Sequence, residues 1–250
     1  MHYSDLTLVL FIAAAGIIGT GLGGVIGSLM YTKKGKGSNL PLAFSLGIMF
    51  GLVIFSIFPE SIELSGIGPT AIIMVIGIFS AGIINLAIVK SRSGSGDIHG
   101  DLSLQNSGIM FVVAVSLHNL PEGIALGAGA HHNIALGITW AILITLHNLP
   151  MGMSISIPLI ESGKSKWFSI ILTALVGSTL LIGGVVGILL GDIGEAFLAG
   201  ALSLAGGILL FVVIKEKIQM FKSKALDAKT ILIIILGIAL SFVITSLGGH

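Results

Sequence analysis

The sequence predicts an all-α membrane protein with eight transmembrane helices. Of its 250 residues, 54% are hydrophobic and only 9% are charged, and the mean hydropathy is +1.10. A soluble domain carries about 25% charged residues, so composition argues against a soluble fold. Apolar stretches also recur along the chain, each close to the roughly 20 residues that cross a bilayer as a helix. We therefore expect residues 1–250 to form a single polytopic domain in contact with lipid.

Eight apolar stretches meet this length requirement, and no polar stretch is long enough to bury a core of its own. The expected spans are residues 6–30, 40–58, 69–89, 107–130, 133–160, 167–190, 195–214 and 230–247. The longest connection, residues 90–106, is rich in Ser and Gly, which predicts a flexible loop. The chain contains no cysteine, so disulfides and thiolate metal sites are excluded.

The lysines and arginines all fall on one side of the predicted bilayer. With eight spans, the connections after spans one, three, five and seven share a side, and together they contain all 12 basic residues. The opposite side carries acids such as Asp5, Glu60 and Glu195. The positive-inside rule places the basic side in the cytoplasm. Both termini are therefore expected outside the cytoplasm, and the loop 90–106 is expected inside it.

Two copies of one polar phrase interrupt adjacent spans. His-Asn-Leu-Pro-Glu-Gly begins at His118 in span four, and His-Asn-Leu-Pro-Met-Gly begins at His147 in span five. The two phrases differ only where Glu122 is matched by Met151. Polar side chains at membrane depth are costly, which makes them functional-site candidates by default. The repeat therefore marks spans four and five as the pair that carries the site.

Helix geometry places the polar groups of each phrase together. Residues four apart differ by about 40° around a helix and by about 6 Å along it, so Glu122 shares a face with His118 and Met151 shares one with His147. Asn119 and Asn148 each come one residue after a histidine, so each lies about 100° further around the helix axis. The sequence places Glu122 as the only acid deep in a span.

The donor set favours a metal ion. Imidazole with carboxylate suits zinc and other divalent first-row metals, whereas the thioether of Met151 favours softer ions. Pro121 and Pro150 each leave a carbonyl one turn earlier without its helical donor, and an ion or a water molecule can supply the partner. A divalent ion held by Glu122 alone would retain one net positive charge, which is unfavourable in a low dielectric.

Other interpretations remain open. An intramembrane histidine can simply bond a neighbouring helix, although two such phrases on consecutive spans favour a ligand site. His131 and His132 are expected to be ordinary residues of the turn between spans four and five. An intramembrane metallo-hydrolase would need a third strong ligand and a free acid or base. The single deep carboxylate disfavours this alternative, so we do not expect an enzyme.

At these residues the sequence resembles the ZIP (Zrt/Irt-like) family of divalent metal transporters, in its prokaryotic form. The paired phrases look like that family's metal-binding signature, and residues 58–63 (Phe-Pro-Glu-Ser-Ile-Glu) are similar to the end of its second helix. Span seven fits as well. The resemblance implies uptake of zinc, iron or manganese into the cytoplasm across the cell membrane, by alternating access. The metal is then cargo, no cofactor or nucleic-acid partner is expected, and a homodimer is implied.

The resemblance also implies which residues and spans take part. It places the ion at mid-membrane and extends the ligand set to span two. The implied ligands are His118, Asn119, Glu122, His147 and Asn148, with Met49 and Ser56 added. It further implies that spans one, four, five and six move as a unit against spans two, three, seven and eight.

Three positions depart from the family pattern. Met151 stands where the family usually has an acid, and residues 176–181 lack the Glu and Pro of its sixth helix. Lys215 replaces one of two acids that usually end span seven. A second, bridged metal ion is therefore in question. A transport-incompetent relative that binds or senses metal remains the alternative.

Overall fold

The chain folds into a bundle of helices. The computed structural model describes residues 3–31, 39–92, 99–132, 134–190, 194–222 and 227–248, and these ranges contain helices and no strand. Side chains are described there except at 3–5, 39, 91–92, 99–106, 129–140, 143, 219–222 and 247–248. The helices are α1 (Tyr3–Ala13), the π-helix η1 (Ala14–Ile18), α2 (Gly19–Met30), α3 (Asn39–Leu52), the π-helix η2 (Val53–Ile57), α4 (Phe58–Ser65), α5 (Ile67–Arg92), α6 (His99–His132), α7 (Ile134–Glu161), α8 (Lys166–Leu190), α9 (Glu195–Lys222) and α10 (Ala228–Gly248).

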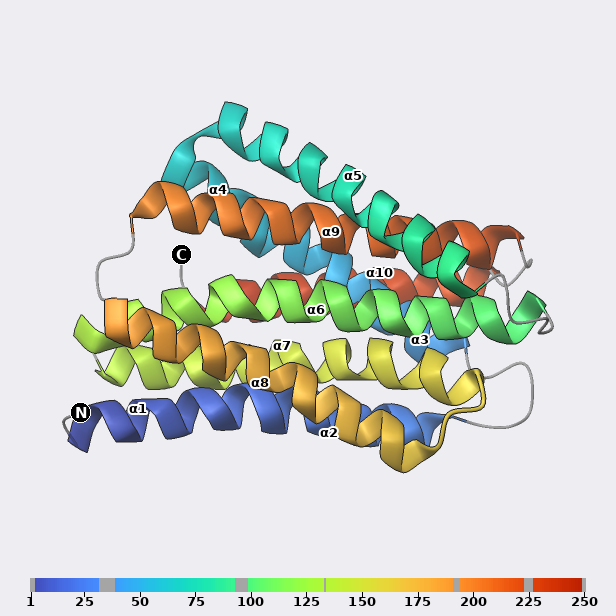
Figure 1. Cartoon of the computed structure of the whole chain (residues 1–250), viewed down its shortest axis with the longest axis horizontal. Helices are drawn as coiled ribbons and strands as arrows, with labels where there is room; N and C mark the ends of the chain where they lie inside the picture. The colour runs from blue at the N-terminus through green and yellow to red at the C-terminus, as the bar shows by residue number, and fades with distance from the viewer. Residues whose placement is uncertain are drawn as a thin grey trace.

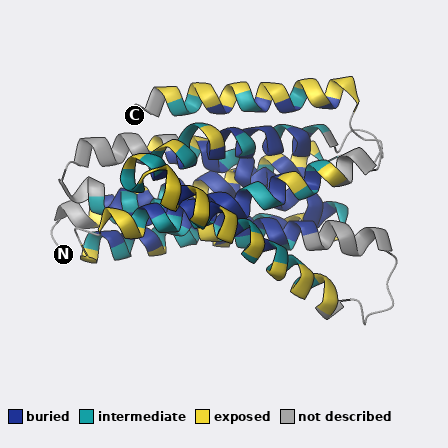
Figure 2. Ribbon diagram, turned by 90° about the horizontal axis from the view of Figure 1, so that it is seen from above, coloured by how far each residue is buried: buried dark blue, intermediate teal, exposed yellow. Residues whose placement is uncertain are grey.

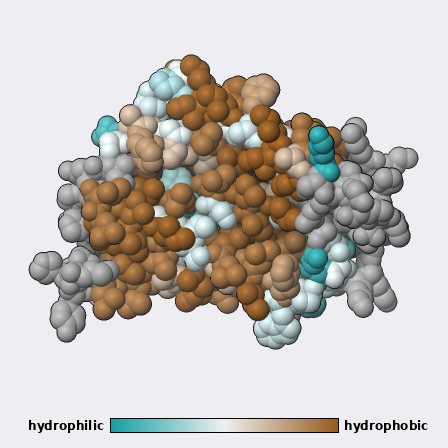
Figure 3. All heavy atoms as spheres, viewed as in Figure 1, coloured by the Kyte–Doolittle hydropathy of each residue, from teal (hydrophilic) through white to brown (hydrophobic). Residues whose placement is uncertain are grey.

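Seven segments of the described chain are long and apolar enough to cross a membrane. They are Leu6–Met30, Leu40–Ser65, Ile67–Lys90, Ser107–Ala128, Lys166–Leu190, Glu195–Ile218 and Ala228–Ser246. The remaining predicted span corresponds to α7, which is 28 residues long. The helices run along one long axis of the molecule (Figure 1), and a broad apolar surface covers the face seen in Figure 3. The prediction of an all-α, multi-pass membrane protein is therefore confirmed.

The second span is longer than predicted. The sequence was expected to leave the helix at residue 58, before Pro59, but α4 continues to Ser65. Pro59 follows directly on the π-helical turn η2, and Ile57 and Phe58 before it keep helical backbone angles. The helix therefore continues through Pro59, although this residue donates no backbone hydrogen bond.

The connection predicted at residues 90–106 is partly helical. α5 ends at Arg92 and α6 already begins at His99, so the polar residues 99–106 extend the fourth helix beyond its apolar part. Residues 93–98 lie outside the described residues. The flexibility and cytoplasmic location of this loop stay predictions.

The helix ends alternate between the two ends of the bundle. α1 begins and α10 ends toward one end, whereas α2, α5, α7 and α9 end toward the other (Figure 1). The turn from α7 to α8 is tightly built, with Gly163 at φ 89° and Lys164 N–H donating to the carbonyl of Leu159. At the start of α10, Asp227 accepts a hydrogen bond from the Thr230 N–H at 2.8 Å, which lowers the pKa of its carboxyl. We call the end that carries these two turns the basic end.

Close glycine contacts join six helical segments into one unit. A Cβ added at Gly16 of η1 would overlap the carbonyl of Gly177 in α8, and one at Gly23 of α2 would overlap the carbonyl of Leu149 in α7. A Cβ at Gly123 of α6 would likewise overlap the backbone of α8. Small residues allow helix backbones to approach this closely in lipid. We call α1, η1, α2, α6, α7 and α8 the site-bearing group.

The other helices form a second unit in the same way. A Cβ at Gly47 of α3 would overlap the carbonyl of Ile234 in α10, and one at Gly77 of α5 would overlap the carbonyl of Leu204 in α9. For each described glycine whose added Cβ would meet another helix, the nearest atom belongs to a helix of the same unit. We call α3, η2, α4, α5, α9 and α10 the supporting group.

Side chains fill the boundary between the two groups. One apolar cluster draws buried residues from α3, α6, α7 and α9, among them Leu46, Phe111, Ile155 and Val212. Figure 2 shows the buried residues gathered in the interior, with exposed residues on the outer faces of the outlying helices. The boundary is therefore densely packed, but its backbones do not interlock.

The glycine contacts can be tested on α5. Gly77→Ala should lower the melting temperature by several degrees, because the new methyl overlaps the α9 backbone and overpacking costs about 1–3 kcal/mol. Gly82→Ala on the same helix is the matched control, since its Cβ would lie 3.6 Å from Phe211, at ordinary contact distance. Thermal unfolding in detergent compares the two. Equal melting temperatures would contradict the interlocked packing of α5 and α9.

Candidate metal centre

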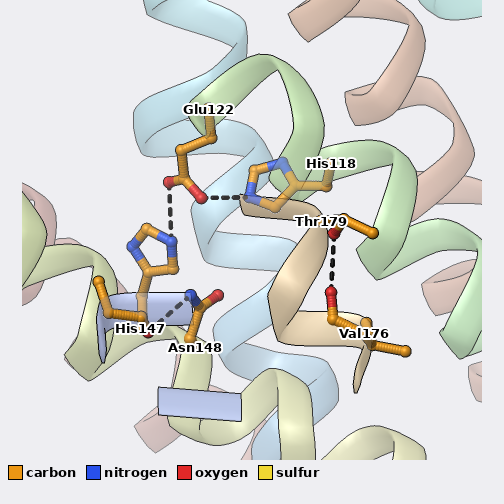
Figure 4. A network of polar contacts seen from close by, with 7 residues as sticks. His118, Glu122, His147, Asn148, Val176 and Thr179 are labelled. Atoms are coloured by element: carbon orange, nitrogen blue, oxygen red, sulfur yellow. Dashed lines mark hydrogen bonds and ion pairs between the residues drawn. The ribbon is translucent and has the colours of Figure 1, made fainter. Parts of the chain in front are cut away.

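Three side chains from the two phrases meet inside the bundle. Glu122 of α6 lies between two imidazoles, with its Oε1 2.8 Å from His147 Nε2 on α7 and its Oε2 3.7 Å from His118 Nε2 on its own helix. Figure 4 shows the carboxylate between the two rings. One ligand atom from each residue can be chosen so that all three lie within 4.8 Å of one another. The pairing of α6 with α7 therefore assembles a potential metal site.

Several polar atoms around this cluster lack partners. His118 is 2% exposed and Asn119 is fully buried. Neither amide atom of Asn119 has a hydrogen-bond partner among the described residues. The same holds for both ring nitrogens of His118. Its Nε2 lies 3.7 Å from Glu122, which is too long for a hydrogen bond. An unsatisfied buried polar group costs about 1–3 kcal/mol. Such a concentration of unpaired donors and acceptors fits a site built for a cation.

The first span orients the second asparagine. Asn148 is fully buried, and its Nδ2 donates to the carbonyl of Ala15 at 3.5 Å. Ala15 lies in η1, and π-helical turns are frequent at functional sites. A Cβ at Gly19 would come within 2.9 Å of the Asn148 Cβ, so this glycine allows the approach. The contact leaves Oδ1 of Asn148 without a partner among the described residues, available as an oxygen ligand.

The departure from the family pattern at residues 176–181, in the sixth span, lies beside the cluster (Figure 4). Thr179 of α8 donates its hydroxyl to the carbonyl of Val176 at 2.7 Å (Figure 4). This segment of α8 carries no acid, and its hydroxyl is already bonded within its own helix. The carboxylate of the centre therefore comes from α6.

The geometry suits a divalent ion after a small rearrangement. Zinc binds imidazole nitrogen at about 2.0–2.1 Å, so two ligand atoms of a tetrahedral site lie roughly 3.3 Å apart. The contact between Glu122 and His147 is shorter than this, and that between Glu122 and His118 is slightly longer. An ion would replace the direct contact between Glu122 and His147 and draw His118 inward.

The remaining predicted ligands have different surroundings. Met49 and Met151 are fully buried in the apolar boundary cluster, and Ser56 is half-buried in η2. Their roles as ligands stay predictions. The side chains of His131 and His132 lie outside the described residues.

A second acid is buried at the end of its span. Glu216 of α9 is only 3% exposed and lies two residues before the end of the apolar segment Glu195–Ile218. Sequence reasoning missed this burial because Lys215 and Lys217 flank Glu216, which is typical of a solvated helix end. It also missed the role of Ala15, because nothing in the sequence marks a π-helical turn.

Comparison with known proteins identifies the family. The family model of the ZIP zinc transporters matches residues 90–245, a stretch that includes α6 and α7 with both phrases. The chain belongs to the ZIP family. This is a family of transporters and not of enzymes. With the seven segments of the described chain that are long and apolar enough to cross a membrane, the chain is a multi-pass protein of the cell membrane.

Curated relatives extend the similarity over most of the chain. The zinc transporter ZupT of Enterobacter sp. (strain 638) is 31% identical over 234 residues, which cover 87% of this chain and 86% of the relative. The zinc transporter ZupT of Akkermansia muciniphila is 30% identical over 241 residues, with 87% and 89% covered. The zinc transporter ZupT of Chlorobaculum parvum is 32% identical over 192 residues, with 69% and 71% covered. The similarity therefore extends beyond the two phrases to the helices that hold them.

The centre can be tested by metal titration. Glu122→Gln should weaken zinc binding by at least about tenfold, because it removes the one charged ligand of the cluster while keeping its shape. Glu195→Gln removes an exposed carboxylate at the start of α9 and should leave affinity unchanged. Calorimetry on the purified proteins compares them. Equal affinity in wild type and Glu122→Gln would place the binding site elsewhere.

Proposed function

We propose that this chain transports divalent metal cations, with zinc as the preferred ion, into the cytoplasm. The observation that carries the proposal is the cluster of His118, Glu122 and His147 among apolar helices of a membrane protein, in which both histidines are buried and Glu122 is half-buried. Membership of the ZIP family and the zinc transporters among its relatives support it. Iron and manganese use the same nitrogen and oxygen donors and are the next candidates.

The proposed topology has eight spans, with α7 as the fifth, and both termini outside the cytoplasm. The basic end of the bundle then faces the cytoplasm. This orientation is supported by the distribution of Lys and Arg in the sequence and by the alternation of helix ends in Figure 1.

The proposed mechanism is alternating access between the two helix groups. All five polar residues of the centre lie in the site-bearing group, on α6 and α7. The supporting group contributes mostly apolar side chains to the boundary cluster. The site-bearing group can therefore carry the ion as a unit, while the boundary cluster opens on one side and closes on the other.

In this mechanism the carboxyl group of Glu122 is ionised when the metal ion binds. The ion takes the Glu122 oxygen and one nitrogen from each imidazole, and Asn119 and Asn148 add oxygen ligands. The histidines must be neutral to bind, so ion uptake releases any proton they carry. One net positive charge remains on the complex, which limits affinity in a low dielectric and favours release.

Transport itself is tested in proteoliposomes over a panel of divalent metals. Wild-type protein should show saturable zinc accumulation, and His118→Ala should abolish it without loss of folded protein, because the ion loses one of its ligands. An exposed substitution such as Glu195→Gln is the control. Metal binding without any accumulation would contradict transport and favour a binding or sensing relative.

The position of Met151 allows a test of ion preference. Met151→Glu should tighten zinc binding relative to cadmium, because a second carboxylate would neutralise the complex and replace a soft ligand by a hard one. Met151→Gln is the matched control, since it has a similar shape without the charge. Titrations with both ions compare the three proteins. If the zinc-to-cadmium ratio is the same in all of them, Met151 does not face the ion.

A further inference from the structure

The first span contacts the second phrase through a π-helical turn. In a regular α-helix the carbonyl of Ala15 would accept a hydrogen bond from the N–H of Gly19, four residues later. In η1 the N–H of Gly19 donates to the carbonyl of Gly16. The carbonyl of Ala15 is thereby offered to a partner outside the helix, and it accepts a hydrogen bond from Nδ2 of Asn148 (Figure 4).

Thr20 completes this turn. Its side chain is fully buried, and its Oγ1 donates to the carbonyl of Gly16 at 2.6 Å. The Gly16 carbonyl therefore accepts from the backbone of Gly19 and from the side chain of Thr20. Threonine hydroxyls that bond to a carbonyl one turn earlier often bend a helix. The hydroxyl of Thr20 thus favours the altered turn over a regular α-helix.

The same threonine is held by two neighbouring helices. A Cβ added at Gly177 of α8 would overlap the Oγ1 of Thr20, and one added at Gly152 of α7 would overlap its carbonyl oxygen. Gly152 is the last residue of the second phrase, four residues after Asn148. Thr20 therefore lies where η1, the second phrase and α8 meet.

Other buried hydroxyls bond to their own helix in the same way, but at regular turns. Thr173 of α8 donates to the carbonyl of Ile170 at 2.7 Å, and Ser45 of α3 donates to that of Pro41 at 3.0 Å. Both side chains are fully buried, and both acceptors lie inside α-helices. The hydroxyl of Thr20 differs from these two because its acceptor lies in a turn that contacts a candidate ligand.

We propose that Thr20 is a positioning residue of the metal centre. Its hydroxyl holds η1 in the form that presents the Ala15 carbonyl to Asn148, and this contact directs the amide oxygen of Asn148 toward the ion. The inference rests on the proposed metal centre and gives the first span a role in it.

The two ends of the Asn148 amide explain why its orientation matters. Nδ2 carries only donors, which a cation repels, whereas Oδ1 is a ligand of the kind that hard divalent ions prefer. With Nδ2 bonded to Ala15, Oδ1 is the end without a partner among the described residues. If η1 relaxes to a regular α-helix, the N–H of Gly19 competes with Asn148 for the Ala15 carbonyl. The amide can then turn, and the ion loses an oxygen ligand.

Zinc titration of the complete chain tests the proposal. Thr20→Val removes the hydroxyl with little change of shape, and it should weaken zinc binding about fivefold, the effect of one lost hydrogen bond. Thr20→Ser keeps the hydroxyl and should bind zinc as wild type does. Thr173→Val is the matched control, because it removes a fully buried hydroxyl of the same helix group at a regular turn. It should leave zinc affinity unchanged.

A double-mutant cycle determines whether Thr20 acts through Asn148. In an Asn148→Ala background there is no amide to orient, so Thr20→Val should weaken zinc binding no further. Equal zinc affinity in wild type and Thr20→Val would overturn the proposal. A full fivefold loss in the Asn148→Ala background would also overturn it, because Thr20 would then affect the centre by another route. Thr20→Ala, which only removes atoms, takes the place of Thr20→Val if the valine variant does not fold.

Thermal unfolding without metal repeats the cycle. The losses in melting temperature in Thr20→Val and in Asn148→Ala should together exceed the loss in the double variant, because both changes break one chain of contacts. Strictly additive losses would contradict the positioning role. A chain that fails to accumulate zinc in proteoliposomes but shows coupling in both cycles would lose the proposed transport and keep Thr20 as a positioning residue. A wild-type chain that binds no zinc would overturn the centre and its positioning residue together.

Discussion

The carboxylate of Glu122 between two imidazoles is the contact on which the rest of the molecule depends. A carboxylate buried in a helical bundle requires close partners, and here they come from one residue four positions earlier on α6 and from one residue on α7. His147 reaches Glu122 only if the two helices hold a fixed register. The glycine contacts of α6 with α8, and of α7 with α2, hold that register, because α2 and α8 are themselves in close contact at Gly24 and Thr173. Packing far from the centre thus determines its geometry.

Sequence reasoning predicted the helical class, the multi-pass character and the pairing of the two phrases, because each depends on local features: apolar length, charge counts and the four-residue spacing of His118 and Glu122. It failed for the features that depend on contacts between distant parts of the chain. Pro59 was expected to end a helix, yet the π-helical turn before it lets the span continue. The burial of Glu216 was also missed, because the lysines on either side of it are typical of a solvated helix end. The hydrogen bond from Asn148 to Ala15 joins residues far apart in the chain, and no spacing rule could predict it.

The division into two helix groups follows from how helices associate in lipid. Between apolar helices in a bilayer there is little hydrophobic driving force, so close van der Waals contact holds them together. Inside each group, glycine brings backbones into such contact, whereas the boundary between groups is filled by side chains such as Phe111 and Val212. Side chains can change rotamer and neighbours, but interlocked backbones must separate before they slide. Relative motion of whole groups therefore costs less than motion within one.

This difference explains where polarity is placed along the boundary. A purely apolar boundary could slide without a preferred position, and a boundary rich in ion pairs would have to break each of them in water-poor surroundings. The chain instead places one buried carboxylate near the basic end, Glu216, with the Nζ of Lys215 3.7 Å away on the same helix. Because both charges lie on α9, this ion pair need not break if the two groups move. The residues of the candidate metal centre all lie within one group, so in the proposed mechanism the ligands need not separate when the boundary moves. Ion binding and group motion can then be coupled through packing around Glu122 without dismantling the site that holds the ion.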